Sequence, residues 1–248
     1  MAVNNPIINA RLKYVNGLEL AYATTTTFTM AAGSASNSSN IDDIILSAPV
    51  TNTITSVGVN GVDVAVAVLS TFYSVYVIGD STGYKATASL LSLSSTAPSL
   101  PSGYDMFRRV GFILTDSSAL LLKFWQYGHG SERDMWYDTA IATPAITTSA
   151  TYVSQSLAAG IPASFAPQAY LKYTFTPNSA TNVATMAPFG STATAGMIVI
   201  GSGVAAAQVG VITVPTALNS TVPTITHKET SSSDALVLLV AGYKDSLA

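Results

Sequence analysis

The strongest pattern of apolar positions lies in residues 106–114, with the sequence MFRRVGFIL. Successive residues of a β-strand point to opposite sides, so such a strand presents two sets of side chains. Met106 and Phe112 belong to one set, and Phe107 and Ile113 belong to the other. Because both sets are largely apolar, we expect a strand that is covered on both of its faces.

Similar runs of β-branched, aromatic and aliphatic residues recur along the chain, separated by turns rich in Gly, Asn, Asp, Ser and Pro. Residues 71–79 and 235–243 are also apolar on both sides, and no amphipathic helical period is visible. Many short runs at this spacing are typical of β-sandwiches and barrels. We expect strands at residues 18–23, 27–30, 41–46, 53–57, 71–79, 86–93, 106–114, 120–126, 132–137, 151–157, 169–176, 182–186, 197–201, 209–214, 224–229 and 235–243.

The distribution of charge divides the chain into two parts. The first 138 residues hold 17 of the 23 charged side chains, whereas Lys172 is the only one between Thr139 and His227. We therefore expect an all-β protein made of two antiparallel β-sandwich domains, both jelly-roll-like. The expected boundaries are residues 1–16 for an extended N-terminal arm that docks on a neighbour, 17–140 for the first domain and 141–248 for the second.

Charge and composition exclude several classes of partner and site. A net charge of −3, with Arg108-Arg109 as the only basic doublet, argues against nucleic acid. The absence of cysteine excludes a disulfide scaffold and thiol catalysis. The N-terminus has no basic region followed by an apolar run, so we expect no signal peptide. Residues 196–218 are apolar enough to suggest a membrane helix, but Gln208, Pro215 and many β-branched residues favour two strands, and we expect no membrane partner.

The low charge content bears on whether the chain acts alone or associates with other proteins. Charged residues make up 9% of the sequence, against a typical value of about 25%. Sheet edges and faces without Lys or Glu lack the usual protection against association. We therefore expect a subunit that packs against copies of itself or other proteins, and the alternative is a charge-poor monomer.

Residues 79–81, GDS, directly follow an expected strand and resemble the nucleophile block of the GDS-type esterases. A serine nucleophile needs a histidine base and an acid that orients it. Those enzymes usually place Asp three residues before the histidine, and neither His129 nor His227 has Asp there. Asp-Ser-Thr-Gly is also a common hairpin turn, so we interpret the segment as a turn and expect no catalytic residue.

Residues 201–206, GSGVAA, follow another expected strand and resemble a dinucleotide-binding fingerprint. That motif works only where a helix opens after the glycines, with an acid about 20 residues further on. Here the sequence continues as VGVITVP, which is typical of a strand, and the first acid is Glu229. We interpret the motif as a connection between strands and expect no cofactor.

Two groups of acidic residues are candidate metal ligands. A zinc site needs three or four ligands in fixed geometry, and a calcium site needs a characteristic loop. Neither pattern is present, so we expect no metal site. The zinc candidates are His129, Glu132, Asp134 and Asp138, and the calcium candidates are Asp42, Asp43 and Asp80.

Arg108-Arg109 and a set of aromatic residues are the remaining candidates for binding. We expect each arginine to pair with a carboxylate such as Asp105 or Asp116, or with a neighbouring subunit, because a buried guanidinium must be paired. The alternative is an anionic partner. The aromatic residues could stack on sugar rings in a receptor site, but we favour core or interface positions for them. They are Trp125, Tyr127, Trp136 and Tyr137.

Several short motifs, taken in order, resemble a group of small structural proteins of tailed-bacteriophage virions, often labelled tail-fibre or head-associated proteins. The central one is PSGYDxxRRxGxxLTD, at residues 101–116. The resemblance covers the chain to about residue 140, and beyond it residues 235–243 are the main similarity. The other matching pieces are residues 16–18 (NGL), 31–35 (AAGSA), 39–40 (SN), 44–46 (IIL), 73–78 (YSVYVI) and 135–138 (MWYD).

This resemblance implies a β-rich, non-enzymatic component of the virion that forms a homo-oligomer. A trimer is expected by analogy with decoration and fibre proteins. The implied role is a capsid or neck decoration, cement or short-fibre protein that binds other virion proteins of the capsid, neck or tail. The alternative is a tail fibre or receptor-binding module that contacts the host surface.

Overall fold

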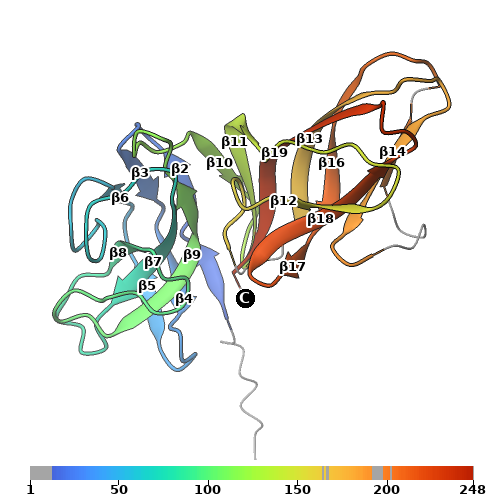
Figure 1. Ribbon diagram of the computed structural model, residues 1–248. Coiled ribbons are helices and arrows are strands. Elements are labelled where there is room, and N and C mark those ends of the chain that lie inside the picture. The colour runs from blue at the N-terminus through green and yellow to red at the C-terminus, as the bar shows by residue number, and fades with distance from the viewer. Residues whose placement is uncertain (1–12, 164, 166–167, 192–197, 202, 248) are drawn as a thin grey trace, which may run out of the picture. The chain divides into compact units, whose positions relative to one another are not determined.

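The computed structural model describes residues 13–163, 165, 168–191, 198–201 and 203–247. Within these residues the regular elements are β-strands, and none is a helix. The strands form several sheets, and antiparallel pairs build each of them. The expected all-β class with antiparallel sheets is therefore confirmed (Figure 1).

The chain forms two compact units. Unit 1 contains the described residues of Met1–Leu122, Gln126–Arg133 and Ser246–Ala248, and unit 2 contains Lys123–Trp125 and Asp134–Asp245. The division therefore lies within residues 122–134, before the composition change near residue 140 on which we based the domain boundary. One continuous strand, β11 (Glu132–Ala142), spans that composition change.

The expected N-terminal arm lies mostly outside the described residues, since the description begins at Lys13. Val15 and Asn16, which we expected in the arm, belong instead to strand β1 (Val15–Gly17). This strand pairs with β4, and Val15 is buried. A short strand of mixed polarity has no clear period, which is why the sequence did not predict it.

Unit 1 contains three groups of paired strands. Their orders are β1-β4-β5, β2-β3-β6 and β8-β7-β9. The strands are β1, β2 (Leu20–Tyr22), β3 (Thr27–Met30), β4 (Gly33–Ser36), β5 (Asp43–Leu46), β6 (Val50–Thr53), β7 (Phe72–Gly79), β8 (Ala88–Ser92) and β9 (Met106–Leu114).

Strand β7 is the central strand of its sheet in unit 1. All of Tyr73–Gly79 is buried, and so is Val110–Leu114 of β9. The prediction that residues 106–114 are covered on both faces is therefore confirmed for Val110–Leu114. Tyr76 lies at the centre, and its hydroxyl donates to the carbonyl of Ser94 over 2.8 Å. Burial raises the pKa of Tyr76 to about 12, which keeps this donor protonated.

The connection into β9 contains a tight turn. The main-chain N–H of Tyr104 donates to the carbonyl of Pro101 over 3.1 Å, which closes a four-residue turn. Gly103 has a φ of +85°, a conformation that side-chain-bearing residues rarely adopt. The turn directs Phe107 toward the core, where its ring meets the ring of Tyr76 edge-on at 5.7 Å.

Unit 2 is built from two sheets. One has the order β16-β13-β19-β11, and the other has the order β12-β18-β14-β15 with β17 beside β18. The strands that begin after residue 150 are β12 (Val153–Ser156), β13 (Gln168–Thr176), β14 (Val183–Pro188), β15 (Ile198–Gly201), β16 (Gln208–Pro215), β17 (Ala217–Asn219), β18 (Val222–Glu229) and β19 (Ala235–Ser246).

Alternate residues of β13 supply one side of the core of unit 2. Leu171 and Phe175 are fully buried, whereas Lys172 between them is exposed. Strand β19 behaves in the same way along its first half, since Leu238 is buried and Val237 is 52% exposed. The outer face of the sheet is therefore exposed along that half of β19, although residues 235–243 are apolar on both sides.

Two expected elements of unit 1 differ from the structure. We predicted a strand at residues 53–57, but β6 ends at Thr53. The side chain of Thr53 accepts from the N–H of Thr55 over 3.3 Å, and such local hydrogen bonds compete with strand pairing. We also expected no strand between residues 30 and 41, yet β4 pairs there on both sides. Its small residues carry no apolar signal.

The apolar region at residues 196–218 contains strands β15 and β16, as the sequence predicted. These strands do not pair with each other, since β15 pairs with β14 and β16 with β13. No helix in the described part of the chain is long and apolar enough to cross a membrane.

The core of unit 1 provides a direct test of this packing. Leu90 of β8 is fully buried, whereas Leu93, just after the same strand, is 63% exposed. We expect Leu90→Ala to reduce the free energy of unfolding by about 2–5 kcal/mol, because it leaves a cavity. The matched change Leu93→Ala should alter it by less than about 0.5 kcal/mol. Urea unfolding followed by circular dichroism measures both, and equal effects would contradict the placement of β8.

Candidate interaction surfaces

The turn at residues 79–85 uses its polar side chains to fix the main chain. The carboxylate of Asp80 accepts hydrogen bonds from the N–H groups of Thr82, Tyr84 and Lys85 at 2.9–3.0 Å. The hydroxyl and N–H of Thr82 contribute most to holding the pKa of Asp80 below its usual value. This arrangement is a hairpin turn, as the sequence predicted.

Ser81 lies in this turn without the partner that a nucleophile needs. Its hydroxyl donates to the carboxylate of Asp105, and its N–H donates to the same carboxylate over 2.8 Å. Among the described hydrogen bonds, none joins Ser81 to His129 or His227. The esterase-like motif is therefore used as a structural link between two turns.

His227 instead belongs to a buried pair in unit 2. Its Nδ1 atom lies 2.9 Å from Oε1 of Glu229, and both side chains have almost no exposed surface. The second carboxylate oxygen of Glu229 accepts from the N–H of Ser149 over 2.7 Å. Residues two apart on a strand share a face, which explains how β18 brings this pair together. The pair links β18 to the segment before β12 and is closed to a substrate.

The dinucleotide-like motif connects two strands. Gly201 ends β15, and the next element in the described chain is strand β16. A helix after the glycines, which pyrophosphate binding requires, is not among the described elements. The interpretation of this motif as a connection is confirmed.

Several of the candidate metal ligands have other partners. Asp138 forms an ion pair with Lys123 at 3.3 Å, and Asp134 accepts a hydrogen bond from the hydroxyl of Tyr170. Asp42 accepts from the side-chain amide of Asn37 over 3.3 Å. No group of three or more His, Asp or Glu residues with the geometry of a metal site is present in the part of the chain that the structure describes.

Arg108 is a structural clamp between β9 and the segment after β4. Its guanidinium donates to the carbonyl of Ser36 over 2.7 Å, to the side-chain oxygen of Asn40 over 2.7 Å and to the carbonyl of Asn37. Partial burial lowers the pKa of Arg108 from its usual value. We expected a carboxylate or a neighbouring subunit as its partner, and the described contacts within the chain are neutral oxygens.

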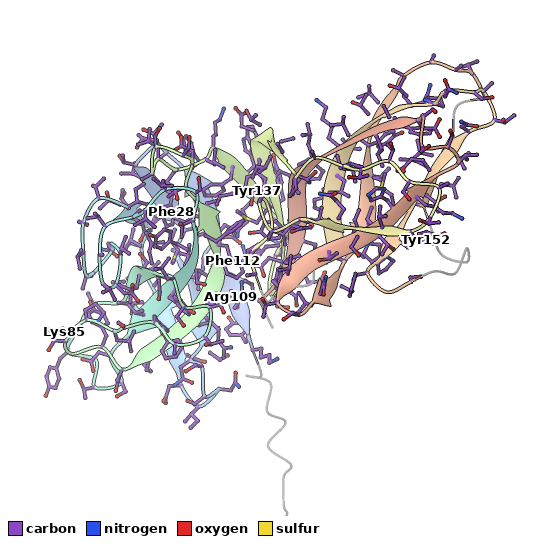
Figure 2. All side chains as sticks on the ribbon, in the orientation of Figure 1. Phe28, Lys85, Arg109, Phe112, Tyr137 and Tyr152 are labelled. Carbon is purple, nitrogen blue, oxygen red and sulfur yellow. The ribbon has the colours of Figure 1, made fainter. Side chains whose placement is uncertain are left out.

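Arg109 points to different partners, as the alternation of a strand requires. Its guanidinium lies 4.4 Å from the centre of the Phe112 ring (Figure 2). It also donates to the carbonyl of Ser246 over 3.0 Å. Both contacts are made within unit 1.

Arg133 is a third structural arginine, and the sequence analysis did not single it out. It is fully buried, and its Nε donates to the carbonyl of Gly130 over 3.1 Å. The guanidinium also donates to the carbonyl of Gly17 and lies 3.2 Å from the carboxylate of Glu19. A single arginine in a polar segment carries no sequence signal of burial, so only the fold reveals this contact.

Two of the four candidate aromatic residues make internal contacts in unit 2. Trp136 stacks on Tyr170 with ring centres 4.5 Å apart and planes at 6°. Tyr137 is buried, and its hydroxyl donates to the carbonyl of Gly160 over 3.0 Å. Burial raises the pKa of Tyr137 far above its usual value. Trp125 and Tyr127 remain 39% and 57% exposed.

Unit 1 exposes a cluster of aliphatic side chains between β6 and β7, which we call the valine loop (residues 57–69). Its main chain is fixed, because the N–H of Asp63 donates to the carbonyl of Leu91 and the N–H of Leu91 donates to Gly61, both at 2.8 Å. The exposed fraction of Val64 reaches 70%. The exposed members are Val57, Val59, Val64, Val66, Val68 and Leu69.

A groove of about 310 Å³ opens beside the valine loop. Its lining is mainly apolar and includes Val64, Val66 and Leu93. Asp63 is the only charged residue in the lining, and its carboxylate accepts from the N–H of Ser99 over 3.0 Å. An apolar groove with a rigid main chain and one carboxylate is suited to a protein surface or an apolar peptide.

Unit 2 exposes a second, nearly uncharged surface on the sheet β16-β13-β19. Cross-strand neighbours on its outer face include Val211 beside Lys172, and Lys172 beside Leu239. The row next to it contains Val209, Thr174 and Val237. Val209, Val211 and Val237 are each more than half exposed. We call this surface the outer sheet face.

Comparison with known proteins gives no further assignment. No protein-family model, curated protein or solved structure matches this chain.

The buried Arg133 contact can be tested by mutation. We expect Arg133→Met to reduce the free energy of unfolding of unit 1 by about 3 kcal/mol, because it leaves carbonyls and the Glu19 carboxylate without their partner. The control Lys123→Met removes an ion pair whose side chains are nearly half exposed, and should change it by less than about 1 kcal/mol. Thermal and urea unfolding measure the difference. A neutral Arg133→Met would show that this clamp is dispensable.

Proposed function

We propose that this chain is a non-enzymatic structural component of a tailed-phage virion: a capsid or neck decoration, cement or short-fibre protein. The observation that carries the proposal is the valine loop, where aliphatic side chains stand exposed on a fixed main chain beside an apolar groove. Large exposed apolar patches mark interaction surfaces. The sequence motifs around residues 101–116 supply the class of particle.

Contact with another protein is energetically favourable for the valine loop. Burying one valine side chain contributes about 1.5–3 kcal/mol, so a few such residues supply much of the stability of a protein contact. The loop residues also need little further ordering, because hydrogen bonds from Asp63 and Leu91 already fix the main chain. Such a surface is well suited to lasting contact with other virion proteins.

The uses of the polar candidates support a structural rather than catalytic role. Ser81 and Asp80 stabilise turns, and Arg108 holds main-chain oxygens. His227 and Glu229 are buried against each other. Each of these side chains has a structural task that an active site would disturb.

A tail fibre or receptor-binding module is the alternative, and it depends on exposed aromatic residues. Trp136 and Tyr137 make internal contacts, which weakens that alternative. Trp125 keeps an exposed fraction of 39%, with the ammonium of Lys123 5.0 Å from its ring. Binding of host-surface glycans, abolished by Trp125→Ala, would favour this role over the structural one.

The virion role predicts that the chain is present in purified particles. Mass spectrometry of virions produced by the genome that encodes it should detect the chain at a fixed copy number, and electron cryo-microscopy should locate it. The expected trimer is tested by the symmetry of the density. Absence from purified virions would reject the proposal.

The role of the valine loop predicts a specific assembly defect. We expect Val64→Asp together with Val66→Asp to lower incorporation into particles by at least tenfold, because two carboxylates replace apolar contacts. The control Tyr84→Asp changes a residue that is 91% exposed and lies outside the loop. Its incorporation should match that of the wild type. Unchanged circular dichroism would show that the double variant still folds, and normal incorporation would exclude the loop as the contact.

A further inference from the structure

Among the described residues, strand β16 has a pairing partner on one side only. It pairs with β13 from Gln208–Phe175 to Pro215–Gln168, and no strand among the described residues pairs with its other side. In antiparallel pairing, alternate residues direct both main-chain groups toward one side. About half of the eight residues of β16 therefore present an N–H and a C=O to the open edge.

The other end strands of the sheets are protected in ways that β16 is not. Strands β1, β5, β6, β8, β12 and β15 have only three to five residues each. Strand β9 is long, but it carries Arg108 and Arg109 and its register with β7 shifts once. Short length, charge and register breaks all hinder the addition of another strand.

Strand β16 has eight residues, QVGVITVP, without charge. Its register with β13 is unbroken, and its single proline, Pro215, stands at the end. Val209 and Val211 point to the outer sheet face with exposed fractions of 63% and 56%. These are the properties of a strand that accepts another strand beside it.

We propose that β16 pairs antiparallel with β16 of a second copy of this chain. The pairing rests on the proposed structural function, for which it names one contact between copies. Because side chains alternate with a period of two, the outer-face valines of one β16 would lie opposite outer-face residues of the other. Cross-strand pairs of β-branched residues stabilise such sheets.

The charges near the edge do not oppose this pairing. The nearest charged side chain on the outer sheet face is Lys172, which lies one strand in from β16 beside Val211. Three strand spacings would separate the two Lys172 residues, or about 14 Å. That exceeds the screening length of about 8 Å at physiological salt.

A pair of identical antiparallel strands has two-fold symmetry. Each copy contributes the same strand, so the contact is closed and involves two chains. It yields a dimer by itself, and a trimer would need a different surface.

The test compares charges placed on β16 with a charge placed elsewhere on the same sheet face. Val209→Lys together with Val211→Lys places like charges across the proposed pair in any register that keeps the faces aligned. The control Val237→Lys adds a charge to the same face, two strands away from the open edge. Size-exclusion chromatography with light scattering, at micromolar protein, should give twice 25.6 kDa for the wild type and the control. The double variant should give 25.6 kDa, with the circular dichroism of the wild type.

Hydrogen exchange of the wild type gives a second measurement that needs no variant. Amides of β16 that face the open edge should exchange at least tenfold more slowly at concentrations where the dimer forms than after dilution to the monomer. Amides of β15 serve as the reference, since that strand lies in the other sheet.

Three results would overturn the pairing. The first is a wild type that stays monomeric, and the second is a double variant that remains dimeric. The third is a control variant that dissociates as much as the double variant, which would indicate contact through the sheet face. A monomeric wild type that is still found in virions would overturn this pairing and leave the proposed function standing. A β16-dependent dimer that is absent from virions would do the reverse.

Discussion

Two guanidinium groups hold the main chain of unit 1 where strand pairing leaves oxygens open. Arg108 binds the carbonyls of Ser36 and Asn37 at the end of β4, and Arg133 binds the carbonyls of Gly17 and Gly130. A buried carbonyl without a hydrogen-bond donor reduces the stability of the fold, and a chain with few charged side chains has few such donors. Each arginine therefore serves several acceptors, which keeps both side chains from acting on a ligand.

The sequence predicted several strands well because their signal is periodic. Strands β3 and β9 begin and end at the predicted residues, and β7 and β13 differ by one residue at an end. β-Branched and aromatic residues give such strands a strong preference. Strand β4 was missed because Gly33–Ser36 has small residues, whose strand conformation comes from neighbours on both sides and from Arg108.

The candidate surfaces were harder to predict than the motifs. The low charge content indicated that the chain associates with other proteins, but it did not show through which surface. The valine loop contains the sequence VDVAVAV, which has the alternation of a half-buried strand. In the structure it follows the bends after β6, where Val64 and Val66 are exposed instead. Exposure depends on which strands lie alongside, and that information is long-range. The Ser81 motif shows the converse, since its local turn chemistry was correctly interpreted from the sequence alone.

The open edge of β16 is not a simple result of a charge-poor sequence. Unit 2 protects β12 and β15 by keeping each to four residues, a device that requires no charged side chain. A shorter strand or an earlier proline would have protected β16 in the same way. Instead the strand is eight residues long, regular in register and valine-rich on its exposed face. This exception also carries no charged residue on the outer sheet face, so edge and face together favour one additional strand.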